Sequence, residues 1–238
     1  MADRRWKRDL GIGLLFTPLL SLLSYVLPAK TALKLVFRVE AWLYTLEGRL
    51  AIQYNGGIHT KHRHLRYHDF FVSRIPAGAQ VLDIGCGVGA VAYDIAERAG
   101  AIVTGIDISE HNVDIARERF SHPNLTYILG DALEYLPDSR FDIVILSNVL
   151  EHLPERPAFL RRVHENTKAE RFLIRVPLFE RDWRVPLKKE LGIEWRLDGT
   201  HETEYTLESF ATEMDEAKLD IVHQEVRWGE IWAEAHSR

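Results

Sequence analysis

Three carboxylates recur through the middle of the chain, each close to the end of a short apolar run. Asp83 lies in the run that leads into a glycine-rich segment, Asp107 ends the next run, and Asp131 follows a third. Such runs are typical of buried parallel strands, whose carboxyl ends meet at one edge of a sheet. Carboxylates there can bind an amino group, two ribose hydroxyls and an exocyclic amine. The set predicts a cationic nucleoside ligand without phosphate.

Each acid also has a purely structural interpretation. Asp107 could cap the helix that follows it, and Asp131 could be a turn residue. What favours a ligand site is the presence of all three acids in order beside the glycine-rich segment.

That segment, from Val81 to Ala92, reads VLDIGCGVGAVA. Gly85, Gly87 and Gly89 remove side chains that would keep a ligand away from the backbone. Their spacing also satisfies the loose dinucleotide-binding pattern. Asp83, at the end of the expected strand, favours a ligand with an amino group instead.

Strand-like and helix-like patterns alternate around these residues, which predicts an α/β fold. We expect a Rossmann-like, doubly wound, mostly parallel sheet with an N-terminal helical extension. Ligands of such sheets lie at the carboxyl ends of the strands. Strands are expected at residues 80–84, 102–106, 125–129, 141–146, 171–176, 220–226 and 228–233, and helices at 88–99, 109–120, 157–166 and 207–218.

The first part of the chain predicts helices of another kind. Residues 31–54 have mixed apolar and charged faces, and Asn55, Gly56 and Gly57 break the pattern. A histidine-rich stretch, 59–75, predicts one further helix, interpreted either as a lid over the ligand or as a solvated basic face. We expect an extension over residues 1–54 and a catalytic domain with its lid over 55–238.

Residues 10–29 form a run of 20 residues without a charge, with basic residues on both sides. Such a run can lie on a membrane, cross it, or pack as a buried helix of the fold or of a dimer. Because Pro18 and Pro28 would interrupt a helix, we favour a peripheral or monotopic segment on the inner face of the membrane.

The motifs DIGCGVG, GIDIS, GDALE and FDIVILSNVLEHLP occur in that order. They resemble class I S-adenosylmethionine-dependent methyltransferases, in the branch that acts on quinones and small molecules, over roughly the last 160 residues. The resemblance implies S-adenosyl-L-methionine as cofactor. It places Gly85, Gly87 and Gly89 against the methionine moiety, Asp107 on the ribose, and Asp131 with Ala132 on the adenine. The full set of expected cofactor-binding residues is Asp83, Gly85, Cys86, Gly87, Gly89, Asp107, Ile108, Asp131, Ala132 and Ser147.

Two histidines are the candidate catalytic residues. His201 lies in a loop where related enzymes often carry a histidine over the acceptor, and its imidazole could take a hydroxyl proton. His152 follows Glu151 after the fourth strand. Ubiquinone O-methyltransferases resemble this segment but have a glutamate where this chain has Asn148, so we expect no metal site.

The formal net charge of −5 gives no basic footprint for nucleic acid. The single cysteine, Cys86, excludes an intramolecular disulfide and fits the cytoplasm. We therefore expect a methyltransferase acting on a small or lipid-linked acceptor, at oxygen. The alternatives are a soluble sugar or natural-product methyltransferase and a non-catalytic cofactor-binding scaffold. The oligomeric state is left open.

Overall fold

The computed structural model describes residue 22 and residues 25–238. The chain divides into two compact units. One runs to Thr60 and includes Leu187–Trp195, and the other comprises Lys61–Pro186 and Arg196–Arg238. Most of the uncharged run at 10–29 lies outside the described residues. Within the part that is described, no helix is long and apolar enough to cross a membrane.

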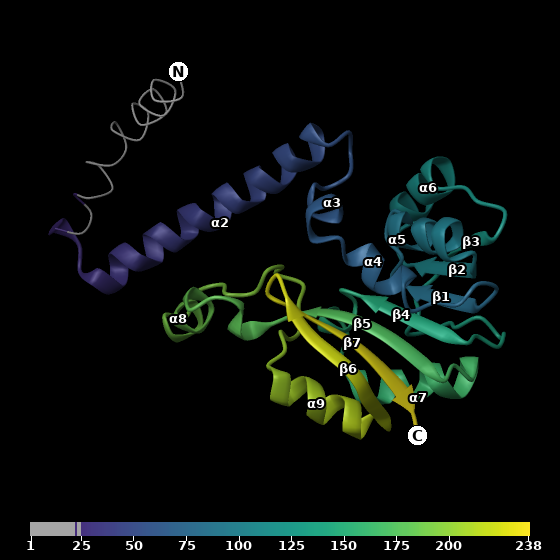
Figure 1. Ribbon diagram of the computed structural model, residues 1–238. Coiled ribbons are helices and arrows are strands. Elements are labelled where there is room, and N and C mark those ends of the chain that lie inside the picture. Colours follow the sequence, from purple (N-terminus) through teal and green to yellow (C-terminus); the bar gives the residue numbers. More distant parts are fainter. Residues whose placement is uncertain (1–21, 23–24) are drawn as a thin grey trace, which may run out of the picture. The chain divides into compact units, whose positions relative to one another are not determined.

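The larger unit is built on a seven-stranded sheet with the order β3-β2-β1-β4-β5-β7-β6 (Figure 1). Strands β1 to β5 are parallel, and β7 is antiparallel to both β5 and β6. The predicted Rossmann-like, mostly parallel sheet is confirmed. The strands are β1 (Gln80–Ile84), β2 (Ile102–Asp107), β3 (Leu125–Leu129), β4 (Ile143–Ser147), β5 (Arg171–Pro177), β6 (Leu219–Arg227) and β7 (Glu230–Ser237).

Helices cover both faces of this sheet because the inner strands are apolar on both sides. In β4, Val144 and Leu146 pack with α7 (Arg156–Thr167) and α9 (Leu207–Glu216). Ile143 and Ile145 of the same strand join the cluster of the opposite face. That face carries α4 (Tyr67–Val72), α5 (Ala90–Asp94), the π-helical turn η1 (Ile95–Ala99) and α6 (Glu110–Arg119).

The smaller unit contains α2 (Ala29–Tyr54), close to the predicted helix at 31–54. Its buried Phe37 lies under the ammonium group of Lys188, 5.1 Å from the ring centroid. Lys188 also pairs with Glu40 at 2.9 Å. Lys188 belongs to α8 (Arg184–Glu190), a helix that the sequence pattern did not predict.

The single helix predicted at 59–75 is wrong. The structure has α3 (Lys61–Leu65) and α4, separated by Arg66 with φ of +53°. This left-handed residue redirects the chain, so that Tyr67, Phe70 and Phe71 are buried in the core. The gain from burying three aromatic side chains outweighs the strain of one left-handed residue, about 1–2 kcal/mol.

Candidate active site

The glycine-rich loop connects β1 to α5, and all three of its glycines have positive φ. A Cβ atom on Gly85 would lie 2.6 Å from Cγ2 of Val149, and one on Gly89 would lie 2.3 Å from the Tyr127 hydroxyl. A Cβ atom on Gly87 would meet nothing within 4 Å. The three therefore differ: Gly85 and Gly89 are required by packing as well as by backbone conformation, and Gly87 by conformation alone.

Asp83 is buried at the end of β1, and its Oδ2 atom has no hydrogen-bond partner among the described residues. Burial, together with the nearby charge of Asp107, raises its pKa to about 8. A buried carboxyl group without a partner costs free energy that a bound cation can offset. Asp83 therefore fits the amino group of a ligand.

Asp107 organises the loop as well as the helix after it. Its Oδ2 accepts from the Gly87 amide at 2.8 Å, and its Oδ1 accepts from the Ser109 amide at 2.9 Å. Ser109 caps α6. Oδ1 also accepts from Asn112 Nδ2 at 3.2 Å, so the lone pair left for a ribose hydroxyl is on Oδ2. Ile108 next to it is 70% exposed, an apolar surface at the end of β2.

Asp131 and Ala132 form the turn after β3. The Asp131 Oδ1 atom accepts from the Leu133 amide at 2.8 Å, and the Ala132 carbonyl accepts from Arg162 at 2.7 Å. The turn interpretation of Asp131 thus holds, and its Oδ2 atom is not needed for it.

A cavity of about 230 Å³ opens at the carboxyl ends of β1 and β4. Five of the predicted cofactor-binding residues contribute to its wall: Asp83, Gly85, Cys86, Gly87 and Ser147. The other predicted residues lie outside this wall: Gly89, Asp107, Ile108, Asp131, Ala132, His152 and His201.

The cavity also contains Arg175 of β5, which the sequence did not single out. Its Nε atom donates to Asn148 Oδ1 at 2.9 Å, and the Tyr67 ring covers its guanidinium group at 3.7 Å. Its buried Nη1 atom has no partner within the described part of the chain. The guanidinium group is paired with Glu230, 3.4 Å from Nε to Oε2, so what it can offer a ligand is the Nη1 donor. This donor and the unpartnered acid Asp83 in one cavity fit an α-amino acid group, such as that of S-adenosylmethionine.

The histidine-rich stretch supplies a further part of the wall, through Lys61, His62 and Tyr67. His62 lies 2.8 Å from the Tyr67 hydroxyl and 2.9 Å from Nε2 of His68. His68 in turn lies 2.8 Å from Asp94 of α5. This chain of hydrogen bonds fixes α3 and α4 to the domain beside the glycine loop.

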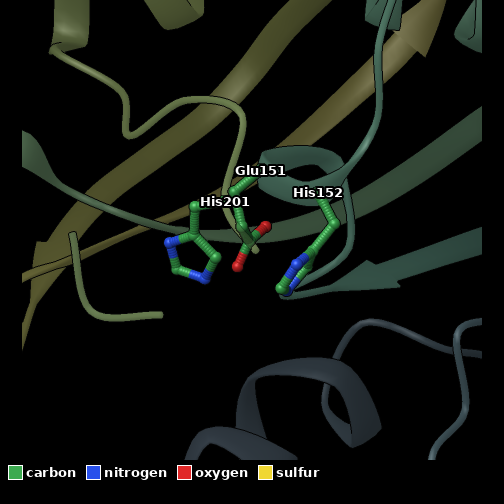
Figure 2. Close-up of side chains that lie close together, drawn as sticks. All are labelled: Glu151, His152 and His201. Atoms are coloured by element: carbon green, nitrogen blue, oxygen red, sulfur yellow. The ribbon is translucent and has the colours of Figure 1, made fainter. Parts of the chain in front are cut away.

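A second group of polar side chains comes from the segment after β4 and from the loop before α9. Figure 2 shows the carboxyl group of Glu151 between the rings of His152 and His201. The two ring centroids are 4.6 Å apart. Neither carboxyl oxygen of the buried Glu151 has a partner among the described residues, and burial raises its pKa to about 8.

His201 is buried, and its Nδ1 atom lies 3.2 Å from Oε1 of Glu204. Burial alone would raise the pKa of Glu204, but hydrogen bonds from His201, the Leu197 amide and Arg181 hold it below the ordinary value. Glu204 therefore stays ionised and holds His201 with Nδ1 as the donor, which leaves Nε2 as the basic nitrogen. In the sequence the pair stands in the segment HETE, so its spacing of three residues is the signal that indicates Glu204.

The same group could also hold a metal ion. Glu151, His152 and His201 each offer a ligand atom, and these atoms lie within 4.8 Å of one another. Asn148 is not part of this set, because its side chain binds Arg175. Burial and the nearby His201 lower the pKa of His152, which favours the neutral imidazole that zinc or a similar divalent ion binds, and such an ion would displace the proton of Glu151.

Comparisons with known proteins agree on one family. Residues 81–170 match the family described as a methyltransferase domain. A ubiquinone biosynthesis O-methyltransferase of Bradyrhizobium diazoefficiens is 34% identical over 131 residues, covering 52% of this chain and 51% of that protein. A 2-methyl-6-phytyl-1,4-hydroquinone methyltransferase of Synechocystis is 29% identical over 156 residues, covering 61% of this chain and 48% of that protein.

The fold has the same relatives. The crystal structure of magnesium protoporphyrin IX methyltransferase from Synechocystis with bound SAH superposes with a TM-score of 0.58 at 23% identity. The match covers 74% of this chain and 84% of that one. The chain spans about half the length of the curated relatives it matches. Its ordered motifs, its strand order and the domain match lead to one conclusion: residues 81–170 form a methyltransferase domain, within a sheet of the class I, S-adenosylmethionine-dependent type.

Proposed function

We propose that the protein transfers a methyl group from S-adenosylmethionine to a hydroxyl oxygen of a small or lipid-linked acceptor. The single observation that carries this proposal is the buried pair of His201 and Glu204, 3.2 Å apart, which can serve as a proton acceptor and its orienting acid. Its neighbour Glu151 acts electrostatically on Arg175 and Lys61, both in the cavity wall. The cavity at the glycine loop and the cluster of Glu151, His152 and His201 can thus serve one reaction.

In this proposal the cofactor binds along the carboxyl edge of the sheet. Asp83 takes the amino group and Arg175 the carboxylate of the methionine moiety, with Gly85, Cys86, Gly87, Gly89 and Ser147 close to its backbone. Asp107 holds the ribose hydroxyls. Ile108, Asp131 and Ala132 surround the adenine. The bound cofactor supplies an electrophilic methyl group on a sulfonium centre.

The chain itself contributes alignment and a base. His201 donates a hydrogen bond from Nδ1–H to the carboxylate of Glu204. Its Nε2 atom takes up the hydroxyl proton of the acceptor as the oxygen–methyl bond forms. The carboxyl group of Glu151, protonated at neutral pH by its raised pKa, can donate to a second oxygen of the acceptor. His152 lies against His201 and helps to fix its ring.

For the location we propose the cytoplasmic side of a membrane, with residues 10–29 as a peripheral or monotopic anchor. Their uncharged sequence supports this, as does the phytyl-bearing substrate in the name of one relative. Flotation of the full-length protein with liposomes tests it. A protein that stays at the bottom of the gradient as a monodisperse, detergent-free species contradicts the anchor and favours a soluble sugar or natural-product methyltransferase.

Transfer of tritium from methyl-labelled S-adenosylmethionine to a panel of catechols, hydroquinones and alcohols tests the reaction. Product formation that requires His201 supports the proposal. Calorimetry with adenosylhomocysteine and with NADH is the accompanying control. Cofactor binding without turnover on any hydroxylated acceptor would favour the non-catalytic scaffold.

A further inference from the structure

Helix α2 has an apolar face that is exposed along its length. Leu35, Val39, Trp42, Leu43 and Leu50 follow the spacing of one helix face. Their exposed fractions are 39%, 40%, 61%, 42% and 52%, in that order. Leu46, half-buried, continues the same row. Scattered exposed apolar residues are ordinary on a protein surface, but a continuous row of this length indicates a contact with something apolar.

The packing within the smaller unit is made by a different face of the helix. Phe37 and Glu40 contact Lys188 of α8, and a Cβ atom on Gly48 would lie 3.9 Å from His59. Phe37 and Gly48 project about half a turn away from the row of Leu35 and Val39, given 100° per residue. The row is therefore a second apolar face, additional to the one that packs.

Charge narrows the choice of partner. Lys34, Arg38 and Arg49 run along one border of the row, so that Trp42 and Leu35 adjoin a basic edge. Of the two acidic residues of α2, Glu40 is paired with Lys188, while Glu47 lies on the opposite border. An apolar row with an aromatic residue beside a basic edge is the pattern of a helix that lies in the interface of an anionic bilayer.

The residues just before α2 extend the same character. Leu22, Tyr25 and Val26 are 55%, 86% and 67% exposed. They belong to the run that has no charge between residues 10 and 29. The exposed row of α2 is therefore continuous along the chain with the segment that has the strongest tendency to enter lipid.

We propose that α2 itself lies in the interface of an anionic lipid bilayer, with the row from Leu35 to Leu50 inserted and Arg38 and Arg49 at the headgroups. This deepens the membrane location proposed above, on which it rests, and does not depend on the acceptor. It makes the membrane contact a property of the described helix as well as of residues 10–29.

Nitroxide labels on the full-length protein test the orientation of the helix. The labels are attached at Val39→Cys, Leu43→Cys and Leu50→Cys, with Ala41→Cys and Tyr44→Cys as exposed controls on the other side. The buried Cys86 should not react with the label, and labelling of the unsubstituted protein serves as the control for this. On adding vesicles of phosphatidylglycerol and phosphatidylcholine, oxygen accessibility should rise several-fold over that of a nickel chelate at 39, 43 and 50. It should not change at 41 and 44.

A second experiment measures binding. Trp42→Glu combined with Leu43→Glu should weaken partitioning to anionic vesicles by roughly tenfold or more, while Ala41→Glu changes it little. The proposal is overturned if the oxygen accessibility of the labels at 39, 43 and 50 does not change when vesicles are added. Labels at 39, 43 and 50 that are already immobilised without lipid also overturn it. Spin coupling that grows with protein concentration would then show that a second copy covers the row. Immobilisation without such coupling would show that another part of the same chain covers it. If the protein floats with the vesicles but the labels on α2 show no change, the proposal for α2 is wrong and residues 10–29 remain as the proposed anchor.

Discussion

His201 and Glu204 form a buried imidazole–carboxylate pair, with 3.2 Å between Nδ1 and Oε1. The carboxylate is held in turn by Arg181 and by the Leu197 amide. An imidazole fixed by an ionised acid has one defined tautomer and one defined direction for its free nitrogen. Here that nitrogen is Nε2 of His201, which the sequence indicated as a candidate base. The acid that orients it, Glu204, follows three residues later in the chain.

The first prediction concerns this pair. His201→Ala should lower kcat roughly 10²–10⁴-fold, because the hydroxyl proton loses its acceptor, while the Kd for adenosylhomocysteine stays nearly unchanged. Rapid-quench kinetics and calorimetry measure the two. Glu204→Gln should cause a smaller loss of kcat and displace the acid limb of its pH profile. A loss of only a few-fold for His201→Ala would assign the residue to packing.

The second prediction concerns the apo protein and pH. The folded pKa of Asp83, about 8, lies above its ordinary value, so the folded state keeps a proton that the unfolded chain has released. The contribution of this proton to the free energy of unfolding is complete below the unfolded pKa of Asp83. It is lost as pH rises through the folded pKa of about 8. Urea midpoints of the wild type should therefore fall over this range more than those of Asp83→Asn.

Cofactor binding supplies the control for Asp83. Adenosylhomocysteine, with its amino group, should stabilise the wild type more than Asp83→Asn, by ~1–3 kcal/mol, because a charge-assisted hydrogen bond is lost in the variant. Asp107→Ala should weaken cofactor binding by a similar amount. Equal affinity in all three proteins would contradict the proposed cofactor geometry.

The third prediction is a comparison of two glycines. Gly89→Ala should reduce the free energy of unfolding by roughly 2–4 kcal/mol, because its Cβ would collide with the Tyr127 hydroxyl and its φ is +83°. Gly87→Ala, with open space around it, should cost about 1 kcal/mol from its backbone conformation. Denaturant unfolding without cofactor measures both. The reverse order would show that the loop packs differently.

The fourth prediction separates a base from a metal ligand. If His201 is the proton acceptor, activity should survive dialysis against a chelator. Added zinc should then inhibit in competition with the acceptor, since Glu151, His152 and His201 can bind it. Activity that disappears with chelation and returns with a divalent ion would assign the three residues to a metal site.

Much of the fold was predictable because buried parallel strands leave a clear signal. The strands at Gln80–Ile84 and Leu125–Leu129 coincide with the predicted ranges, and the helix predicted to begin at residue 109 is capped by Ser109. The break at Arg66 left no such signal, since neither glycine nor proline marks it. It arises from tertiary packing, which sets Tyr67 on the guanidinium group of Arg175.

The candidate site divides in the same way. Asp83 and the three glycines stand in a contiguous motif, so the order of residues along the chain indicated them. Arg175 lies 92 positions after Asp83, inside an apolar strand, and only the pairing of β4 with β5 brings it to the cavity. Contacts between distant segments are absent from local patterns, which is why Arg175 could not be found in this way.

The position of β7 has a consequence for how the molecule is made. It pairs with β5 along seven residues, from Arg171 to Pro177, and carries the fully buried Trp232. During synthesis β5 leaves the ribosome roughly 60 residues before its second neighbour, which at ~5–20 residues per second leaves an apolar edge unpaired for several seconds. That interval is when a chaperone would have most to protect, and slowing translation before residue 230 should lower the soluble yield.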